Sequence, residues 1–565
     1  MFLIVDRKIY CREHTSLFSF RFSKHFVGGL IFLAVLALLI WRLPLGIDFS
    51  DEAYYAIFID DWLKGGIGSS TLTTIHQTAQ LLPYAILRIL GIEKTPDGMI
   101  LWMRVMYLVA STTAALVLLR LLVRICKPVS AWCCAAVALS FIPFGLPAVS
   151  YNTIGLQGLI VALSALGIAL SDKRLYRSWA VVSAVGWAIS VTAYPSLGLT
   201  LAACVAILGV MEGLKKFAFY YVAVLIVVQA SAWVAVINAL SFERLLDSVA
   251  YLAAINDVDG WSRKIDYSFG LLASHRTFTI ACTLSIVLGV FRQHLGVHLT
   301  SVGIAILVVI LFKGHVALFC RSHDVVTVVS LTGIGLVTRM RRACFLPTDR
   351  VLGLIWLTGM AAGLTTMASA YHSILNFPVG AAIAAVASLA GLSPKNKPMI
   401  KSAVAAQAVV IIALLNTSLF YYYGSPPNAP MLASKISGGA FAGLRGTQFQ
   451  AEALTWVQND VAPLAGDDRS IAFVGWNYGL ILATPLRPQM LAVPPLMNST
   501  GLAINHDFFA KQQNRPSLVI IQEDVGYRPL NPLGPRFADW YEQISSKQWP
   551  PSTFTVYRRK PESIN

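Results

Sequence analysis

Long apolar runs separated by short polar loops dominate the first 420 residues of the chain. A transmembrane helix needs roughly 17–25 mostly apolar residues, so the pattern predicts about 13 membrane-spanning helices. The runs lie at 27–45, 100–122, 129–149, 153–171, 179–194, 196–212, 217–239, 277–292, 299–319, 325–338, 351–370, 378–393 and 401–420.

After residue 420 the apolar segments become short. Runs at 471–474 and 518–521 and an alternating stretch at 553–557 predict strands, and 450–461 predicts a helix. The fold class is therefore an all-α polytopic membrane protein with a small C-terminal α/β domain. The expected divisions are a cytoplasmic segment, 1–26, a transmembrane module, 27–420, and an extracytoplasmic domain, 421–565.

The composition supports a membrane protein. Of the 565 residues, 56% are hydrophobic and 13% are charged, whereas soluble domains average about 25% charged residues. The formal net charge is +16, but the basic residues are spread over the loops of the membrane part and form no tight run, so no nucleic-acid partner is expected. The 8 cysteines have no metal-binding spacing and are expected to pack as small hydrophobes.

The basic residues predict the orientation. Alternate loops carry Lys and Arg, as at Arg124 and Lys215, while the opposite loops around Tyr151 and Tyr194 carry none. Positive loops remain in the cytoplasm, which predicts a cytoplasmic N-terminus, and an odd number of spans places the C-terminal domain outside. Two further outer segments are long, 46–99 and 240–276.

An acidic cluster follows the first apolar run directly. Charges this close to a bilayer need water or a partner. Ser50 or Asp48 can cap a helix that begins at Asp51, with Asp51 and Glu52 in the first turn, where the helix dipole favours anions. Aromatic residues at helical spacing follow, and 81–89 reads as a second interfacial helix. A favourable helix start alone would also account for the two carboxylates.

A membrane helix, the motif Asp51-Glu52-Ala53-Tyr54-Tyr55, interfacial helices and then Arg104 near the second span resemble the GT-C superfamily of membrane glycosyltransferases. Aminoarabinose transferases and protein O-mannosyltransferases belong to it. The resemblance implies that Asp51, with Glu52 beside it, is the catalytic base. It also implies a polyprenyl-phosphate sugar donor and a single inverting displacement.

Two departures from the family narrow this expectation. Aminoarabinose transferases commonly have an Arg where this chain has Tyr54, so the donor phosphate must be bound elsewhere. The tryptophan-rich Asp motif of oligosaccharyltransferases is absent from the tail, where 475–479 is only a faint echo. That argues against transfer of a whole oligosaccharide to Asn.

Sugar transfer from a lipid phosphate needs a base for the acceptor hydroxyl and cations for the departing phosphate. The candidate phosphate ligands are Lys313, Arg104, Arg321 and Arg88. The candidates for the sugar and acceptor pocket are Asp48, Tyr55, His76, Tyr151, Asn152 and His372. Each has an ordinary alternative role as an interfacial anchor, a snorkelling cation or a solvated polar residue.

No cofactor or metal is expected. Asp48, Asp51, Asp60 and Asp61 could in principle hold a divalent cation, but lipid-monophosphate-sugar enzymes of the superfamily generally require none. The expected activity is transfer of one sugar to an envelope acceptor (lipopolysaccharide, lipid A, another glycolipid or a protein) at the periplasmic face of a bacterial inner membrane.

Two other classes of function stay open: a multi-pass transporter or lipid flippase, and a non-catalytic envelope assembly protein. A transporter is disfavoured because the sequence has no internal repeat and its charges concentrate outside the spans.

Overall fold

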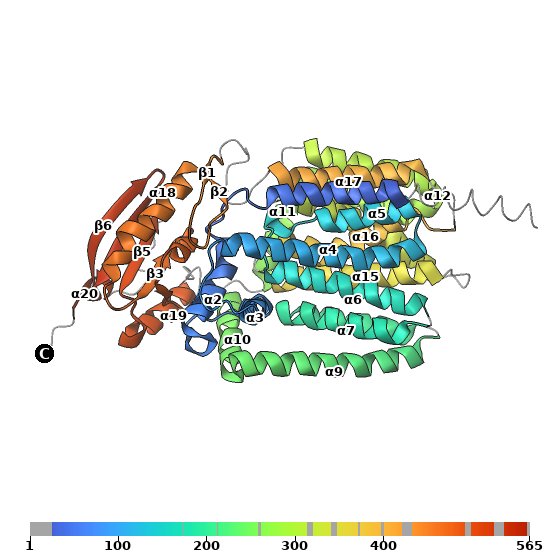
Figure 1. Ribbon diagram of the computed structural model, residues 1–565. Coiled ribbons are helices and arrows are strands. Elements are labelled where there is room, and N and C mark those ends of the chain that lie inside the picture. Colours follow the sequence, from blue (N-terminus) through green and yellow to red (C-terminus); the bar gives the residue numbers. More distant parts are fainter. Residues whose placement is uncertain are drawn as a thin grey trace, which may run out of the picture.

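The computed structural model has a bundle of long helices, a C-terminal sheet domain, and a layer of short helices between them (Figure 1). It describes residues 25–561 except 173, 212, 258–260, 314–319, 341–346, 371–372, 397–399, 421–431, 492–498 and 525–535.

The apolar runs form the bundle. Its helices are His25–Arg42, α4 (Met99–Ile125), α5 (Pro128–Ser140), α6 (Tyr151–Ser171), α7 (Tyr176–Ala193), α8 (Leu197–Val210), α9 (Lys215–Leu240), α12 (Arg276–Lys313), α13 (Arg321–Leu331), α14 (Gly335–Met340), α15 (Pro347–Ser369), α16 (Phe377–Ala390) and α17 (Lys401–Phe420). Among the described residues, 8 helices are long and apolar enough to cross a membrane. The chain is thus a multi-pass membrane protein, but the predicted count of about 13 spans is not confirmed.

Helix α12 is one reason why the count differs. Its backbone breaks at Gly296, which has φ 71° and ψ 171°, a conformation that glycine adopts readily. Gly303 packs against the side chain of Leu288, and Phe278 shares a core cluster with Leu311. The two halves therefore run antiparallel, as two separate predicted runs would.

Helices α6 and α7 approach each other closely through small residues. A Cβ on Gly186 would lie 2.6 Å from the backbone nitrogen of Ala162. Hydroxyls bridge the same interface, since Ser183 Oγ donates to Ala162 O (2.7 Å) and Ser190 Oγ donates to Gly155 O (2.9 Å). Small residues with interhelical hydrogen bonds are typical of helix packing in membranes.

The C-terminal domain is built on a mixed sheet with strand order β4-β3-β5-β7-β6. The strands are β3 (Ser470–Val474), β4 (Arg487–Pro488), β5 (Leu518–Glu523), β6 (Tyr541–Trp549) and β7 (Ser552–Arg559). A short ribbon, β1 (Ser434–Lys435) and β2 (Arg445–Gly446), and helices α18 (Gln448–Trp456), α19 (Ser499–Ala510) and α20 (Phe537–Trp540) complete it. The predicted strands at 471–474, 518–521 and 553–557 are confirmed, as is a helix within 450–461.

The layer between bundle and sheet comes from the two predicted outer segments. The first forms α2 (Asp51–Gly65), η1 (Ile67–Ser69), η2 (Ile75–Gln80) and α3 (Leu81–Ile89), and the second forms α10 (Phe242–Asp257) and α11 (Trp261–Ser274). Figure 1 shows α10 crossing the end of α9 beside the C-terminal domain.

Helix α2 shares one hydrophobic core with the C-terminal domain. Phe58 and Trp62 belong to the same buried cluster as Phe473 and Tyr478. Backbone hydrogen bonds join the two parts, including Gly479 N to Phe49 O (2.7 Å). The C-terminal domain is therefore part of the scaffold that positions α2.

Ion pairs reinforce this junction. Arg487 Nε donates to the buried Asp61 Oδ1 (2.6 Å), and Arg487 Nη2 donates to Ser69 Oγ (2.9 Å). Lys64 Nζ donates to the buried Asp60 Oδ2 (2.8 Å) and to Thr484 O (3.0 Å). Asp61 directly, and Asp60 through Lys64, thereby attach the second half of α2 to the C-terminal domain.

We expect Arg487→Ala to lower the free energy of unfolding by about 2 kcal/mol or more, because it leaves the Asp61 carboxylate buried without its cation. Thermal unfolding of the detergent-solubilised protein would measure the loss. Arg536→Ala is the matched control, since Arg536 pairs with Asp539 at a surface where both side chains are more than half exposed, and it should cost less than about 1 kcal/mol. Equal losses in the two variants would contradict the role of the Asp61–Arg487 pair.

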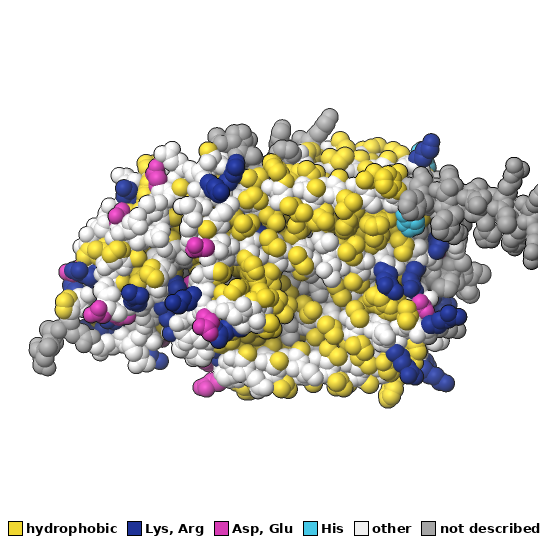
Figure 2. All heavy atoms as spheres, in the orientation of Figure 1, with side chains coloured by type: hydrophobic (Ala, Val, Ile, Leu, Met, Phe, Trp, Pro, Cys, Tyr) yellow, Lys and Arg dark blue, Asp and Glu magenta, His cyan; other side chains and the backbone are white. Residues whose placement is uncertain are grey.

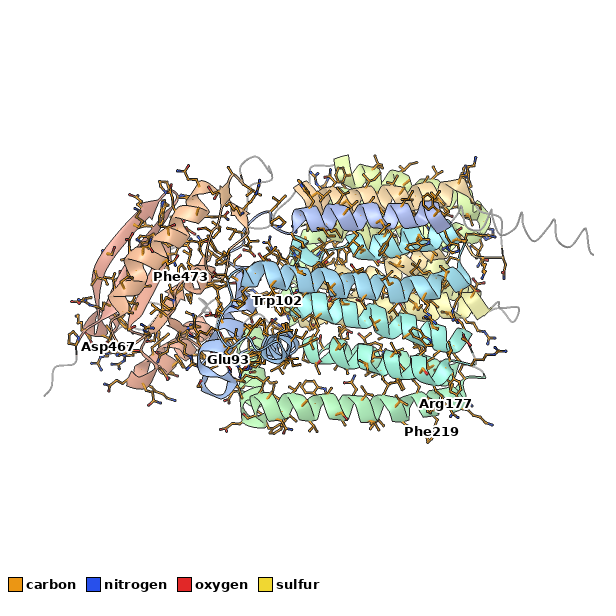
Figure 3. The ribbon with its side chains drawn as sticks, viewed as in Figure 1. Glu93, Trp102, Arg177, Phe219, Asp467 and Phe473 are labelled. Atoms are coloured by element: carbon orange, nitrogen blue, oxygen red, sulfur yellow. The ribbon has the colours of Figure 1, made fainter. Side chains whose placement is uncertain are left out.

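Basic side chains gather at the end of the bundle remote from the C-terminal domain (Figure 2). The N-terminus of α4 contacts that domain, because Ile100 N donates to Ala440 O (3.0 Å), so Arg124 at the other end of α4 lies far from it. Figure 3 places Arg177 and Phe219 at the same remote end, with Trp102 at the end near the domain. The two ends of the bundle thus differ in charge.

Candidate active site

Asp51 is the accessible carboxylate of the acidic cluster. It opens α2 and is exposed, whereas Asp48, Glu52, Asp60 and Asp61 are buried. Electrostatic interactions link Asp51 to Tyr54, Tyr55 and Tyr151. Asp51 therefore stands at the rim of an aromatic surface between the bundle and the C-terminal domain.

Asp48 caps the helix that carries Asp51. Its Oδ2 accepts from Glu52 N (2.8 Å), and its Oδ1 accepts from Ser50 N (2.8 Å) and Ser50 Oγ (2.5 Å). Asp48, and not Ser50, thus accepts a hydrogen bond from a free backbone N–H group in the first turn of α2. Its predicted place in the sugar pocket is corrected, because both oxygens face the backbone and side chain of its own loop.

Burial, followed by the neighbouring Asp51 charge, raises the pKa of Asp48 to about 7, against the lowering effect of its hydrogen bonds. The unfolded chain would release this proton near pH 3.8. The folded protein keeps the proton up to about pH 7. Between these two pH values the unfolded chain is ionised at Asp48 while the folded protein is not, so the free energy of unfolding falls as pH rises.

We expect sugar-transfer activity to rise with pH through an inflection near pH 7, because ionised Asp48 adds a negative charge beside Asp51 and raises the proton affinity of that base. Asp48→Asn keeps a capping residue but should remove the inflection. A pH–rate profile with saturating substrates checks this. Glu93→Gln, at an exposed carboxylate of the same outer segment, should leave the inflection in place. An unchanged inflection in Asp48→Asn would refute the assignment.

Glu52 and Arg104 form a buried, bidentate ion pair. Arg104 Nε donates to Glu52 Oε1 and Arg104 Nη2 to Glu52 Oε2, both at 2.6 Å. The remaining guanidinium donors reach Leu43 O (2.6 Å), Leu45 O (3.1 Å) and Gly46 O (2.9 Å). Arginine has five N–H donors, and protein acceptors take all of them.

This pair corrects two sequence predictions. Arg104 has no donor left for a phosphate, so it is not a phosphate ligand. Both Glu52 oxygens face Arg104, so Glu52 is not an alternative base but fixes the first turn of α2 to the end of α4 that lies near the C-terminal domain. Asp51 remains the candidate base.

Aromatic rings from separate elements meet beside Asp51. Tyr151, at the start of α6, stacks on His76 of η2 with ring centroids 3.8 Å apart and planes 6° apart. It also lies edge-on to Tyr194 (5.0 Å, 85°) and 6.2 Å from Tyr55. The structure thus brings together the predicted pocket residues Tyr55, His76 and Tyr151, and adds Tyr194. Rings with polar edges offer both an apolar surface and hydrogen-bonding groups.

His76 is neutral in this setting. Burial lowers its pKa to about 4, so at neutral pH it carries no charge for a phosphate. It can still hydrogen-bond to a sugar hydroxyl through a ring nitrogen.

Buried amide groups adjoin the aromatic cluster. Asn152 Oδ1, Gln77 Oε1 and Gln80 Oε1 have no hydrogen-bond partner among the described residues. The amide nitrogens are engaged in two cases, Gln77 with Ser248 Oγ (2.9 Å) and Gln80 with Val149 O (3.3 Å). Unsatisfied buried acceptors are costly, which makes these groups candidates to receive hydroxyls of a ligand. Sequence reasoning named Asn152 but missed Gln77 and Gln80, although they recur three residues apart in η2.

The other predicted phosphate ligands remain predictions. Arg88 is exposed in the last turn of α3. Arg321 is half-buried at the start of α13, with its guanidinium 5.3 Å from the ring centroid of Phe312. Lys313 ends α12, but its side chain lies outside the described residues, as does His372.

Three of the carboxylates that could in principle hold a divalent cation have other roles. Asp48 caps α2, Asp60 pairs with Lys64 and Asp61 pairs with Arg487. In the described parts of the chain, no group of three or more His, Cys, Asp or Glu residues is placed to hold a metal ion.

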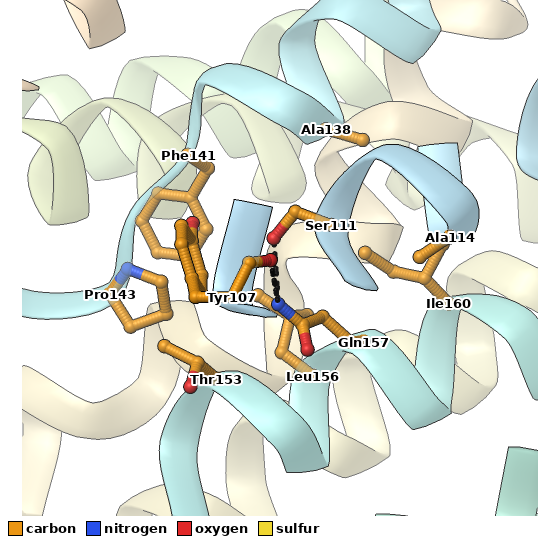
Figure 4. Close-up of a pocket in the computed structure, with 10 residues that line it drawn as sticks. All are labelled: Tyr107, Ser111, Ala114, Ala138, Phe141, Pro143, Thr153, Leu156, Gln157 and Ile160. Atoms are coloured by element: carbon orange, nitrogen blue, oxygen red, sulfur yellow. Dashed lines mark hydrogen bonds between the residues drawn. The ribbon is translucent and has the colours of Figure 1, made fainter. Parts of the chain in front are cut away.

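A small cavity inside the bundle is too small for a substrate (Figure 4). It lies between α4, α5 and α6 and has a volume of about 10 Å³, room for about one water molecule. Gln157 Nε2 closes it by donating to Ser111 Oγ (2.7 Å) and Tyr107 O (3.2 Å).

The chain matches no protein-family model and no curated protein. Its structure is similar to that of the oligosaccharyltransferase of Archaeoglobus fulgidus in the apo form, at 12% identity and a TM-score of 0.48, covering 89% of this chain and 69% of that one. It is also similar to ArnT from Cupriavidus metallidurans bound to undecaprenyl phosphate, at 10% identity and a TM-score of 0.42, covering 93% and 97%.

Both neighbours are at most 12% identical to this chain. Both TM-scores are below 0.5, so a shared activity does not follow from this likeness.

Proposed function

We propose that this chain is an integral-membrane glycosyltransferase of GT-C type that transfers one sugar from a polyprenyl-phosphate donor to an envelope acceptor. The observation that carries the proposal is the setting of Asp51. It is an exposed carboxylate at a helix N-terminus, beside a cluster of aromatic rings and amide oxygens without hydrogen-bond partners among the described residues. The neighbouring carboxylates have structural roles, because Asp48 caps α2 and Glu52 pairs with Arg104.

In the proposed reaction Asp51 accepts the proton of an acceptor hydroxyl. The hydroxyl oxygen bonds to the anomeric carbon as the bond from that carbon to the phosphate oxygen breaks. Polyprenyl phosphate leaves with the bonding electrons, and the anomeric configuration inverts. A positioned carboxylate is a competent general base, and cations at the outer helix ends, Lys313, Arg321 and Arg88, remain the candidates to stabilise the departing phosphate.

The proposed orientation places the N-terminus in the cytoplasm and the C-terminal domain in the periplasm of a bacterial inner membrane. The basic side chains at the end of the bundle remote from that domain support it, because positive loops stay in the cytoplasm. The acceptor classes in view are lipopolysaccharide, lipid A, another glycolipid and a protein.

Purified protein incubated with a panel of undecaprenyl-phosphate sugars tests the function. We expect one donor to release undecaprenyl phosphate, detected by mass spectrometry. Mass analysis of envelope glycans from cells with and without the protein should then show the loss of one sugar. A protein that consumes no lipid-linked sugar but moves a solute into proteoliposomes would be a transporter, and the proposal would be wrong.

A further inference from the structure

A large cavity opens beside the interfacial helix α10. It has a volume of about 720 Å³ and lies between the loop 68–73, the end of α9, the first turns of α10, and Leu491 and Ile504 of the C-terminal domain. Sites for small ligands typically span about 300–1,000 Å³. The cavity is therefore large enough for a substrate group, unlike the small cavity inside the bundle.

Polar side chains form a large part of its wall. They include the hydroxyls of Thr71, Ser241 and Tyr251, the amide of Asn238 and the carboxylates of Glu243 and Asp247. Such groups donate to and accept from hydroxyls. This lining suits a ligand with many hydroxyls, which is the chemistry of a saccharide.

The Tyr251 hydroxyl is a buried polar group that a ligand could satisfy. Tyr251 is 8% exposed, and its hydroxyl has no hydrogen-bond partner among the described residues. A buried hydroxyl without a partner is costly, and a ligand in the cavity would supply one. Thr73 lines the cavity, and the next residue, Thr74, accepts a hydrogen bond from the Tyr54 hydroxyl (3.3 Å) of α2, the helix that begins at Asp51, so the cavity lies on the side of the candidate base.

Charge in the cavity disfavours an anionic ligand. The basic residue of the lining, Arg244, donates to Ile67 O (2.5 Å) and Leu72 O (2.7 Å), which ties it to the loop. Glu243 and Asp247 are exposed, and neither forms an ion pair in the described residues. Phosphate oxygens would meet these carboxylates.

Beside the residues that line the cavity, α10 has an apolar, exposed face. Phe242, Leu246 and Val249 recur at spacings of four and three and are 60%, 53% and 51% exposed. A helix with one apolar face and one polar face is suited to the membrane interface. The cavity therefore opens where the head of a membrane lipid would lie, with its tails beside the apolar face.

We propose that this cavity binds the uncharged saccharide headgroup of a glycolipid acceptor. The proposal rests on the glycosyltransferase function above and selects one of its acceptor classes. The glycolipid tails stay in the bilayer, and the terminal hydroxyl of the headgroup extends toward Asp51.

Native mass spectrometry of the full-length protein with two probes tests this. The probes are a dihexosyl diacylglycerol and the same lipid with a phosphate on its terminal hexose. We expect the neutral lipid to bind at least about tenfold more tightly. Tyr251→Phe should weaken its binding about fivefold, the effect of one neutral hydrogen bond. Tyr267→Phe, at an exposed tyrosine of α11, is the matched control and should change nothing.

Donor hydrolysis separates this proposal from the glycosyltransferase function. Tyr251→Phe should release undecaprenyl phosphate from the donor, with water as acceptor, at the wild-type rate and with an unchanged melting temperature. Equal or tighter binding of the phosphorylated probe, or no effect of Tyr251→Phe on the neutral one, would overturn the proposal even if donor hydrolysis persists. If the wild-type protein hydrolyses no donor, the proposed glycosyltransferase function itself would be wrong.

Discussion

Replacing Asp51 with asparagine is expected to lower the rate of sugar transfer by about 10²–10⁴-fold, the usual contribution of a positioned general base. The substitution keeps the size of the side chain and removes only its ability to take a proton. Because Asp51 is exposed, we expect the free energy of unfolding to fall by no more than about 1 kcal/mol, the worth of a carboxylate at a helix N-terminus.

Single-turnover measurements with saturating donor and acceptor would isolate this effect. Donor binding should be retained in Asp51→Asn. Glu93→Gln, which neutralises an exposed carboxylate elsewhere in the same outer segment, should transfer sugar at the wild-type rate. If Asp51→Asn still turns over within a fewfold of wild type, the base is another group.

Replacing Arg104 with methionine should give the largest loss of stability, about 3–5 kcal/mol, because it leaves the Glu52 carboxylate buried without a partner. The side chains of Arg104 and Glu52 are both at most 4% exposed, so water cannot replace the guanidinium as the partner of the carboxylate. The carbonyls of Leu43, Leu45 and Gly46 would lose the hydrogen bonds from Arg104 at the same time.

The double variant Glu52→Met/Arg104→Met provides the control. Removing both charges should recover part of the loss, since a buried ion pair can be replaced by apolar residues more cheaply than it can be broken. Thermal unfolding in detergent would rank wild type above the double variant, and the double variant above Arg104→Met. A single variant as stable as wild type would show that the pair contributes little.

The helices and the main strands could be predicted because each depends on a local pattern. The apolar runs at 277–292 and 299–319 indicated two helices, and Gly296 supplied the break between them. The start of α2 could be predicted, but its capping residue could not, because Asp48 and Ser50 can both serve as caps. Backbone geometry selected Asp48.

Partners far apart in the sequence could not be predicted. Arg104 was assigned to a phosphate because it follows the first outer segment, but nothing in the sequence shows that Glu52 and three carbonyls would saturate its donors. Likewise, Asp61 carries no sign that its cation would be Arg487. The candidate base could be named from the sequence because the motif that it opens resembles that of GT-C glycosyltransferases, whereas the side chains around it are brought together only by the tertiary fold.

The core shared by α2 and the C-terminal domain also constrains the order of biosynthesis. Phe49 and Gly479 are joined by a backbone hydrogen bond, yet a ribosome adding roughly 5–20 residues per second makes them about 20–90 s apart. During that interval the membrane helices are inserted while α2 still lacks its packing partner. A nascent or prematurely terminated chain would therefore occupy the membrane with α2 unsupported, and the candidate active site would be complete only after the last strands of the sheet had been translated and folded.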